Sequence, residues 1–129
     1  MTPYRAPQSK AELLTRYMLG ERYFADTELP DRTDLQHVDL SGAVFDGAML
    51  SDIDFQFAKL TGVSFRNANV KCSDFRSADL RGVSFEGAAV EAVLLNGANL
   101  EDIRIDGATY CGYTLRQCDL DTWLESLTG

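Results

Sequence analysis

Apolar residues recur at every fifth position along most of this chain. From Leu35 to Leu120, all eighteen positions at this spacing are Leu, Phe, Val, Ile or Tyr. A second row, rich in Ala, Val and Ile, lies two positions before each of them. An α-helix repeats every ~3.6 residues and a strand every ~2, so a period of five indicates neither. It predicts a repeat architecture in which short, similar segments stack on one another.

A spacing of twenty residues is superimposed on the period of five. It places Phe45, Phe65 and Phe85 in one column, and the row of smaller residues shows the same register. Four five-residue segments therefore complete one turn of a square coil, in which residues n and n + 20 stack. With strands roughly 4.8 Å apart, about four and a half such turns make a rod of about 22 Å.

The corners of this coil carry the residues that sharp turns need. Two positions after each large apolar residue, glycine occupies eight of the seventeen positions between residues 37 and 117. Asp52, Asn67 and Asp102 add three residues that tolerate a left-handed backbone. A turn at every fifth residue is what a square coil requires.

The repeat unit itself resembles a known signature. Two segments, ADLRG at 78–82 and ANLED at 98–102, resemble the A(D/N)LXX motif of pentapeptide-repeat proteins, and residues 16–22 resemble the leader of many cyanobacterial members. The resemblance implies an all-β solenoid, a right-handed quadrilateral β-helix of about four and a half coils. An N-terminal capping helix and a short C-terminal helix are expected at its ends.

The N-terminal end carries a helix signal. Ser9 and Glu12 have the spacing of a capping box, which predicts a helix that ends near Gly20 or Phe24. Its apolar residues are expected to cover the open first coil: Leu13, Leu14, Tyr17, Met18 and Phe24.

The C-terminal end has a shorter apolar cluster. Thr122 is expected to cap a helix that carries Trp123, Leu124 and Leu127. These three residues either cover the last coil or form the contact of a homodimer, so the protein is expected to be a monomer or a homodimer through this end. The chain is thus divided into three parts: 1–32 as capping helix and leader, 33–121 as β-helix, and 122–129 as C-terminal cap.

Composition and charge narrow the classes of function. The net charge is −8, and residues 33–121 hold 14 acidic and 7 basic residues. Such a surface disfavours direct binding of nucleic acid or an anionic membrane. The chain has no run of eighteen apolar residues and no secretory signal at its start, so a cytoplasmic location is expected.

The residue types that carry most enzyme chemistry are scarce. An odd number of cysteines without a C-x-x-C spacing indicates reduced thiols, with Cys72 and Cys111 pointing outward and Cys118 inward. The chain has one histidine, His37. Because the interior rows fill the tube and no inserted loop interrupts them, we expect no catalytic, cofactor or metal site and no enzymatic activity.

Charged residues form a basic belt around one turn. Its members are Arg66, Lys71, Arg76 and Arg81, one on each successive face. The spacing of twenty sets acidic residues against three of them: Arg66 with Glu86, Lys71 with Glu91, and Arg81 with Glu101. The belt is interpreted either as ion pairing between coils or as a charged docking ring.

One column stacks like charges. Asp34, Asp54 and Asp74 lie twenty residues apart, on a face that also carries Arg76. The column is either a site for a cation or a basic partner, or a solvated surface whose carboxylates bind neighbouring backbone amides. His37 and Phe57 stack at the adjacent corner, where they either cover leader residues or contact a partner.

Two functional hypotheses remain. The first is a protein-interaction or scaffold module with an unidentified protein partner. The second comes from the resemblance, since some pentapeptide-repeat proteins mimic duplex DNA and bind type II topoisomerases such as gyrase. The expected rod carries one net negative charge per roughly 3 Å, against roughly 1.7 Å for duplex DNA, which weakens the second hypothesis.

Overall fold

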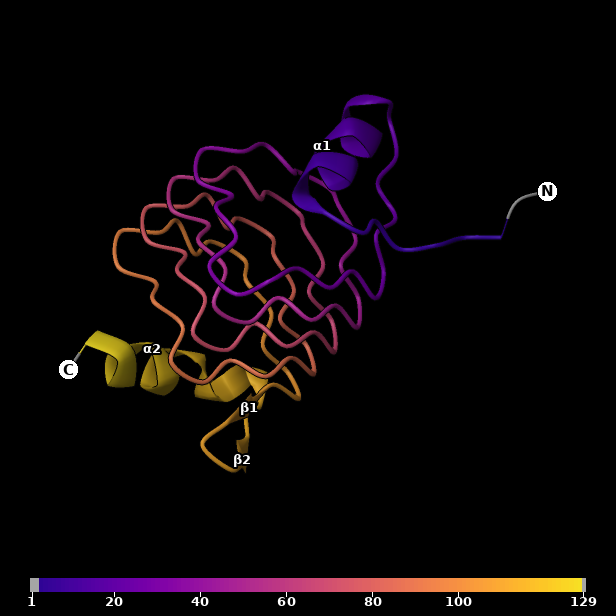
Figure 1. The fold of residues 1–129 in the computed structure, drawn as a ribbon. Coiled ribbons are helices and arrows are strands. Elements are labelled where there is room, and N and C mark those ends of the chain that lie inside the picture. Colours follow the sequence, from indigo (N-terminus) through magenta and orange to yellow (C-terminus); the bar gives the residue numbers. More distant parts are fainter. Residues whose placement is uncertain (1–2, 129) are drawn as a thin grey trace.

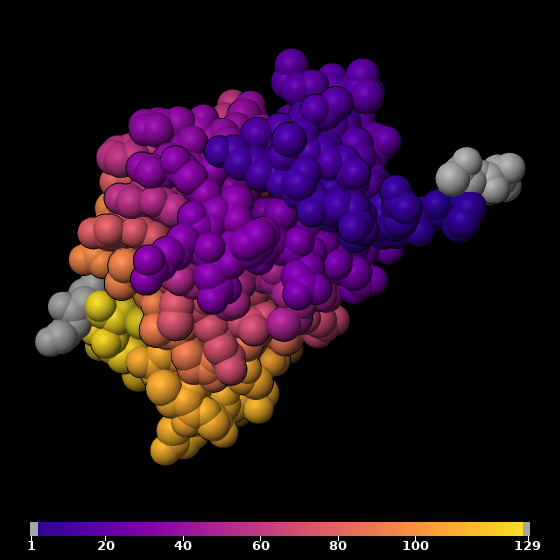
Figure 2. Space-filling view, in the orientation of Figure 1, coloured from indigo at the N-terminus to yellow at the C-terminus, as the bar shows by residue number. Residues whose placement is uncertain are grey.

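The protein is a four-sided coil with a helix at each end (Figure 1). The computed structural model describes residues 3–128. The elements follow in the order α1 (Lys10–Met18), the coil, β1 (Thr109–Tyr110), β2 (Tyr113–Thr114), a 3₁₀ turn η1 (Gln117–Asp119) and α2 (Leu120–Thr128). Figure 2 shows α1 and the leader covering one end of the coil, while the hairpin and α2 lie toward the other.

Parallel bridges between residues twenty apart hold the coils together. One column runs from Asp34 through Asp54 and Asp74 to Leu94. Two faces of the coil have five levels of bridged residues and two have four, which gives four and a half coils. The predicted register and number of coils are therefore confirmed.

The coil begins earlier than the boundary expected between residues 32 and 33. Tyr23 bridges Val44 at a spacing of 21 residues, in place of the usual twenty. The shift arises because Leu29 and Leu35 are six residues apart and not five. The sides of the coil up to Leu29 are therefore one residue out of register with the pattern that starts at Leu35. The sequence signal was present, since Leu29 follows another apolar residue at a spacing of five.

The coil also ends earlier than residue 121. Its last bridge joins Ala89 to Thr109, and the chain then turns back in the antiparallel β1–β2 hairpin. Cys111 and Gly112 both have positive φ (50° and 83°), as a two-residue hairpin turn requires. The expected inward position of Cys118 is wrong, because this residue lies in η1 beyond the coil and is exposed.

Stacked phenylalanine rings fill the interior. Phe45 and Phe65 have ring centroids 5.8 Å apart, and Phe65 and Phe85 5.5 Å apart. A second column begins with Phe55 on Phe75, at 5.0 Å. The two predicted inward rows are buried along most of the coil, and they leave a packed tube without a channel.

The corners adopt the left-handed backbone that the turn residues indicated. All fifteen corner positions from residue 37 to residue 107 have positive φ. Glycine is not required at each of them, since His37, Phe57 and Ala92 take the same conformation. At Phe57 the φ is 59°, in a region that bulky side chains rarely occupy.

The N-terminal helix begins as predicted and ends sooner. The Ser9 hydroxyl accepts a hydrogen bond from the Glu12 N–H at 3.1 Å. Leu13 is fully buried over the first coil, but the expectation for Met18 is wrong: it is the last residue of α1 and is 83% exposed. The helix ends where Gly20 takes a positive φ of 100° and the Glu21 N–H donates to the Arg16 carbonyl at 3.0 Å.

Candidate interaction surface

No interior site exists in the part of the chain that the structure describes. Within residues 3–128, no group of three or more His, Cys, Asp or Glu side chains is placed to hold a metal ion. The same residues include no helix long and apolar enough to span a membrane. Most polar and charged side chains of these residues lie on the outer faces of the coil and at its two ends.

The four cations of the basic belt do not form one surface. Arg66 pairs with Glu86 at 3.3 Å and Lys71 with Glu91 at 3.5 Å, as the stacking rule predicted. Each of these cations lies on its own face beside its own carboxylate. Two of the four cations thus pair between coils, and the structure does not bring the belt together as a docking ring.

Arg81 pairs with Asp79 and not with Glu101, the partner predicted from the stacking of coils. Its guanidinium donates to both carboxylate oxygens of Asp79, at 2.9 and 2.6 Å. Residues i and i + 2 of a strand point to the same side, so Asp79 lies beside Arg81 on the same coil. The guanidinium therefore binds the carboxylate of its own coil and not the one a coil away. The Asp79 carboxylate also accepts a hydrogen bond from the Arg81 backbone N–H, which holds it in place.

The aspartate column is stabilised by backbone amides. Asp34 accepts a hydrogen bond from the N–H two residues ahead at 2.9 Å, and Asp54 and Asp74 do the same at 3.1 and 3.0 Å. These bonds favour the charged carboxylate and, at Asp34, are the main reason that its pKa lies below the ordinary value. The hydrogen-bonded interpretation of the column is supported.

Only one of these three aspartates has a cation bound to it. Arg76 donates to both oxygens of Asp74, at distances from 2.7 to 3.1 Å, and lowers the pKa of that carboxyl. One coil earlier, the neutral amide of Gln56 takes the same place on Asp54, at 3.1 and 3.3 Å. Within residues 3–128, Asp34 and Asp54 form no ion pair, although Lys10 lies close enough to Asp34, and Arg76 to Asp54, for the charges to interact.

An aromatic pair lies at the corner beside these carboxylates. The rings of His37 and Phe57 stack with centroids 5.0 Å apart and planes within 2° of parallel. Both residues are exposed, Phe57 by 54%. We call this side of the coil the aspartate face and define it as residues 34–37, 54–57, 74–77 and 94–97.

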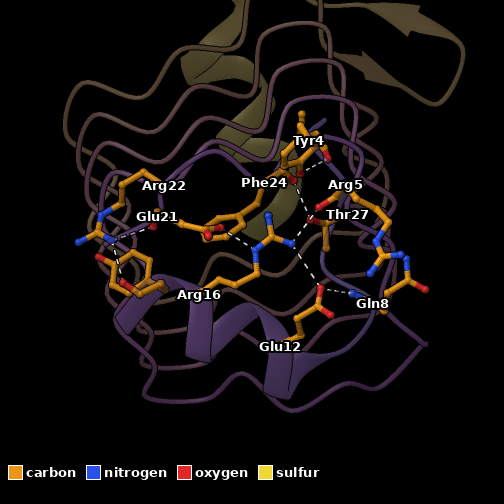
Figure 3. A network of polar contacts seen from close by, with 11 residues as sticks. Tyr4, Arg5, Gln8, Glu12, Arg16, Glu21, Arg22, Phe24 and Thr27 are labelled. Carbon is orange, nitrogen blue, oxygen red and sulfur yellow. Dashed lines mark hydrogen bonds and ion pairs between the residues drawn. The ribbon is translucent and has the colours of Figure 1, made fainter. Parts of the chain in front are cut away.

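A second polar cluster lies at the N-terminal end and was not predicted (Figure 3). Its centre is Arg16, which donates to Glu21 at 2.6 Å, to Glu12 at 3.3 Å and to the carbonyl of Arg5 at 2.8 Å. The hydrogen bond to Glu21 raises the pKa of Arg16. The i, i + 4 spacing of Glu12 and Arg16 on the helix is a local signal for one of these pairs. The contacts of Arg16 with Arg5 and Glu21 form only after the chain folds back.

Tyr4 and Tyr17 donate hydrogen bonds to backbone carbonyls at the open edge of the first coil. Tyr17 donates its hydroxyl to the carbonyl of Ser41, and Tyr4 does so to the carbonyl of Ala25, both at 2.7 Å. In later coils the corresponding carbonyls accept from a corner N–H, as Thr61 does from Gly42. Burial raises the pKa of both tyrosines, so the hydroxyls stay protonated donors.

The N-terminal cluster therefore anchors the leader. A cleft of about 1010 Å³ opens beside it, lined by Pro3, Tyr4, Arg5, Glu12, Arg16, Glu21, Arg22 and Tyr23. The charged groups of Arg16, Glu12 and Glu21 bind one another, which leaves little of their charge for a ligand.

The C-terminal residues cover the last coil within the same chain. Trp123 is 3% exposed and belongs to the core, while Leu124 and Leu127 are partly buried against it. This geometry favours the cap interpretation for Trp123, since a residue so buried has little surface to offer a second copy.

The comparisons with known proteins agree with this architecture. Residues 31–105 match the family model described as the pentapeptide repeat region. The chain is similar to alr5209, a pentapeptide repeat protein from Nostoc PCC 7120, with 32% identity, 82% of this chain and 84% of that chain covered, and a TM-score of 0.60. Curated protein sequences give no match.

A more distant likeness shows the fold alone. QnrB1, a plasmid-mediated fluoroquinolone resistance protein, has a TM-score of 0.58 and 20% identity, over 68% of this chain and 43% of that one. The family model covers more than half of the chain and the bridges form four stacked faces. This protein therefore belongs to the pentapeptide-repeat family and folds as a right-handed quadrilateral β-helix.

Proposed function

We propose that this protein is a non-enzymatic interaction module that binds another protein through its aspartate face. The observation that carries the proposal is the exposed ring pair of His37 and Phe57 beside Asp34 and Asp54, whose carboxylates form no ion pair within residues 3–128. Exposed aromatic side chains are typical of a contact surface.

The other three faces of the coil are less suited to binding a partner. Their prominent charges bind one another, as Arg66 does with Glu86 and Arg81 with Asp79. Among the described residues of the coil, the exposed large apolar side chains are Tyr23, Met49, Phe57 and Leu94, and the last two lie on the aspartate face. Partner binding at this face is therefore supported by both apolar surface and charge.

Mimicry of DNA toward gyrase is not the function we propose. The likeness to QnrB1 is at 20% identity and bears on the fold alone. A DNA mimic needs dense negative charge along its length. Here Arg76 and Arg81 neutralise the aspartates beside them, which interrupts the negative surface.

Site-specific cross-linking tests the proposal. A photoreactive phenylalanine analogue is placed at Phe57 and, in a separate protein, at Ala92, an exposed corner of another face with the same left-handed backbone (φ 59°). After irradiation in extract of the cells that make the protein, we expect a discrete adduct from position 57 and none of that mass from position 92. Equal adducts from both positions, or none from position 57, would refute the proposed surface.

A further inference from the structure

We infer that the aspartate face receives an arginine side chain of its partner, which stacks on the Phe57 ring and pairs with the carboxylate of Asp54. The inference rests on the proposed function and adds the chemistry of the contact. Three features of the face support it. The stack of rings ends at Phe57, the exposed Phe57 ring is attached to a left-handed backbone that disfavours it, and an aspartate–guanidinium pair of the same kind lies one coil away.

The stack of rings at this corner ends at Phe57. His37 covers one face of the Phe57 ring, with the two planes within 2° of parallel. The next corners of the same column are Ser77 and Gly97, which have no ring to continue the stack. The stack of rings therefore ends at Phe57, which is 54% exposed, and a planar cation binds well to an exposed ring face.

Phenylalanine at this corner is unfavourable for the fold taken alone. The left-handed backbone at Phe57 (φ 59°) suits glycine, which occupies other corners such as Gly62 and Gly82. Burial does not compensate, because the ring is more than half exposed. A ring that the fold does not need, in a conformation that disfavours it, indicates a role in contact with another molecule.

The neighbouring coil shows how a guanidinium sits on this face. Arg76 binds both oxygens of Asp74. On Asp54 the neutral amide of Gln56 occupies the matching place, and the negative charge that remains interacts with Arg76 from one coil away. A partner arginine that approaches Asp54 meets this charge and, at the next corner, the ring of Phe57. Lysine has no planar group to stack, so the site distinguishes the two cations.

The test uses three synthetic peptides that differ in one side-chain type. The probes are acetyl-Gly-Arg-Gly-Arg-Gly-amide and its counterparts with lysine or neutral citrulline in place of arginine. Each is titrated into the full chain while NMR follows the ring signals of His37 and Phe57. We expect saturable shifts with the arginine peptide, at least about fivefold weaker binding of the lysine peptide, and no saturation with citrulline.

Variants separate this contact from general attraction to an acidic protein. Phe57→Asn and Asp54→Asn should each weaken the arginine peptide at least about fivefold, and Phe57→Trp should retain binding. Asp102→Asn is the control for charge, since it removes one negative charge from an exposed residue of another face. Unchanged melting temperatures show that each variant is folded.

The outcomes distinguish the two proposals. Equal binding of the arginine and lysine peptides, unchanged binding by Phe57→Asn, or equal effects of Asp54→Asn and Asp102→Asn would overturn the arginine contact. If position 57 nevertheless cross-links to a partner, the proposed interaction surface stands and its chemistry is different. If position 57 does not cross-link, the interaction surface itself is wrong.

Discussion

The side-chain amide of Gln117 replaces a backbone peptide group beneath Ile105. Its Oε1 accepts from the Ile105 N–H at 2.7 Å, and its Nε2 donates to the carbonyl of Ile103 at 3.0 Å. One coil earlier, the Phe85 N–H donates to the backbone carbonyl of Arg104, also at 2.7 Å. The coil thus ends without leaving these inner groups unpaired, because one carboxamide supplies both an acceptor and a donor.

Replacing Gln117 with leucine should destabilise the end of the coil. The change leaves two buried backbone groups without partners, and we expect a loss of about 2–4 kcal/mol in the free energy of unfolding. Gln117→Glu keeps the acceptor and loses the donor, so its cost should be smaller. Urea denaturation measures both, with the exposed Gln36→Leu as control. If Gln117→Leu unfolds like the parent protein, water replaces the amide without cost.

Removing one hydroxyl tests how the first coil is sealed. Tyr17→Phe deletes the donor to the Ser41 carbonyl. We expect about 1 kcal/mol of lost stability, seen as a lower melting temperature. Tyr23→Phe is the control because Tyr23 is exposed and its hydroxyl has no hydrogen-bond partner among the described residues. Equal melting temperatures for the two variants would contradict the sealing role.

The phenylalanine columns should dominate stability. Phe65→Ala removes a fully buried ring that contacts rings above, below and beside it, and should cost about 3–5 kcal/mol. Phe57→Ala removes an exposed ring and should cost under about 1 kcal/mol. Denaturant unfolding of the pair measures the difference. Similar costs at the two positions would show that the inward assignment is mistaken.

The row of small residues should resist enlargement. Ala68 is buried, so Ala68→Leu forces a larger side chain into a filled tube and should cost about 1–3 kcal/mol or more. Ala89 lies in an outward row, and Ala89→Leu should be nearly neutral, as the exposed Leu94 in an equivalent position suggests. Thermal unfolding separates the two. A stable Ala68→Leu protein would mean that the interior holds unfilled space.

The Arg81–Asp79 pair gives the fold a defined sensitivity to acid. The hydrogen bonds from Arg81 lower the pKa of Asp79 from its ordinary 3.8 to about 2. Because the folded pKa lies below the unfolded one, the ionised carboxylate stabilises the fold above about pH 4, and this contribution is lost as the pH falls toward about 2.

Arg81→Gln should therefore raise the pKa of Asp79 toward its ordinary value and leave that of Asp74 unchanged. NMR titration of the carboxyl carbons measures both groups in one experiment. At neutral pH even Arg81→Glu should cost under about 1 kcal/mol, because the pair is partly exposed. A titration of Asp79 that Arg81→Gln does not alter, or a much larger loss at neutral pH, would contradict the assigned pairing.

The sequence by itself determined the coil, its register and its corners. Each five-residue segment meets the same local requirement, with a large apolar side chain such as Phe65, a small one such as Ala68 and a turn residue such as Gly82. Because the requirement recurs every twenty residues, stacked neighbours follow from counting. The columns of Asp34, Asp54 and Asp74 and of His37 and Phe57 were predictable in this way, and with them most of the candidate surface.

Only the tertiary structure decided where the coil begins and ends and which charges pair. One inserted residue before Leu35 puts the first sides of the coil out of register with the five-residue pattern. At the other end, the Cys111–Gly112 turn ends the coil, although the apolar spacing continues to Leu120. Arg81 pairs with Asp79 and not with Glu101, which the count of twenty residues had indicated. Stacking is a property of every repeat, whereas an end or an ion pair depends on which groups the folded chain brings within a few ångströms.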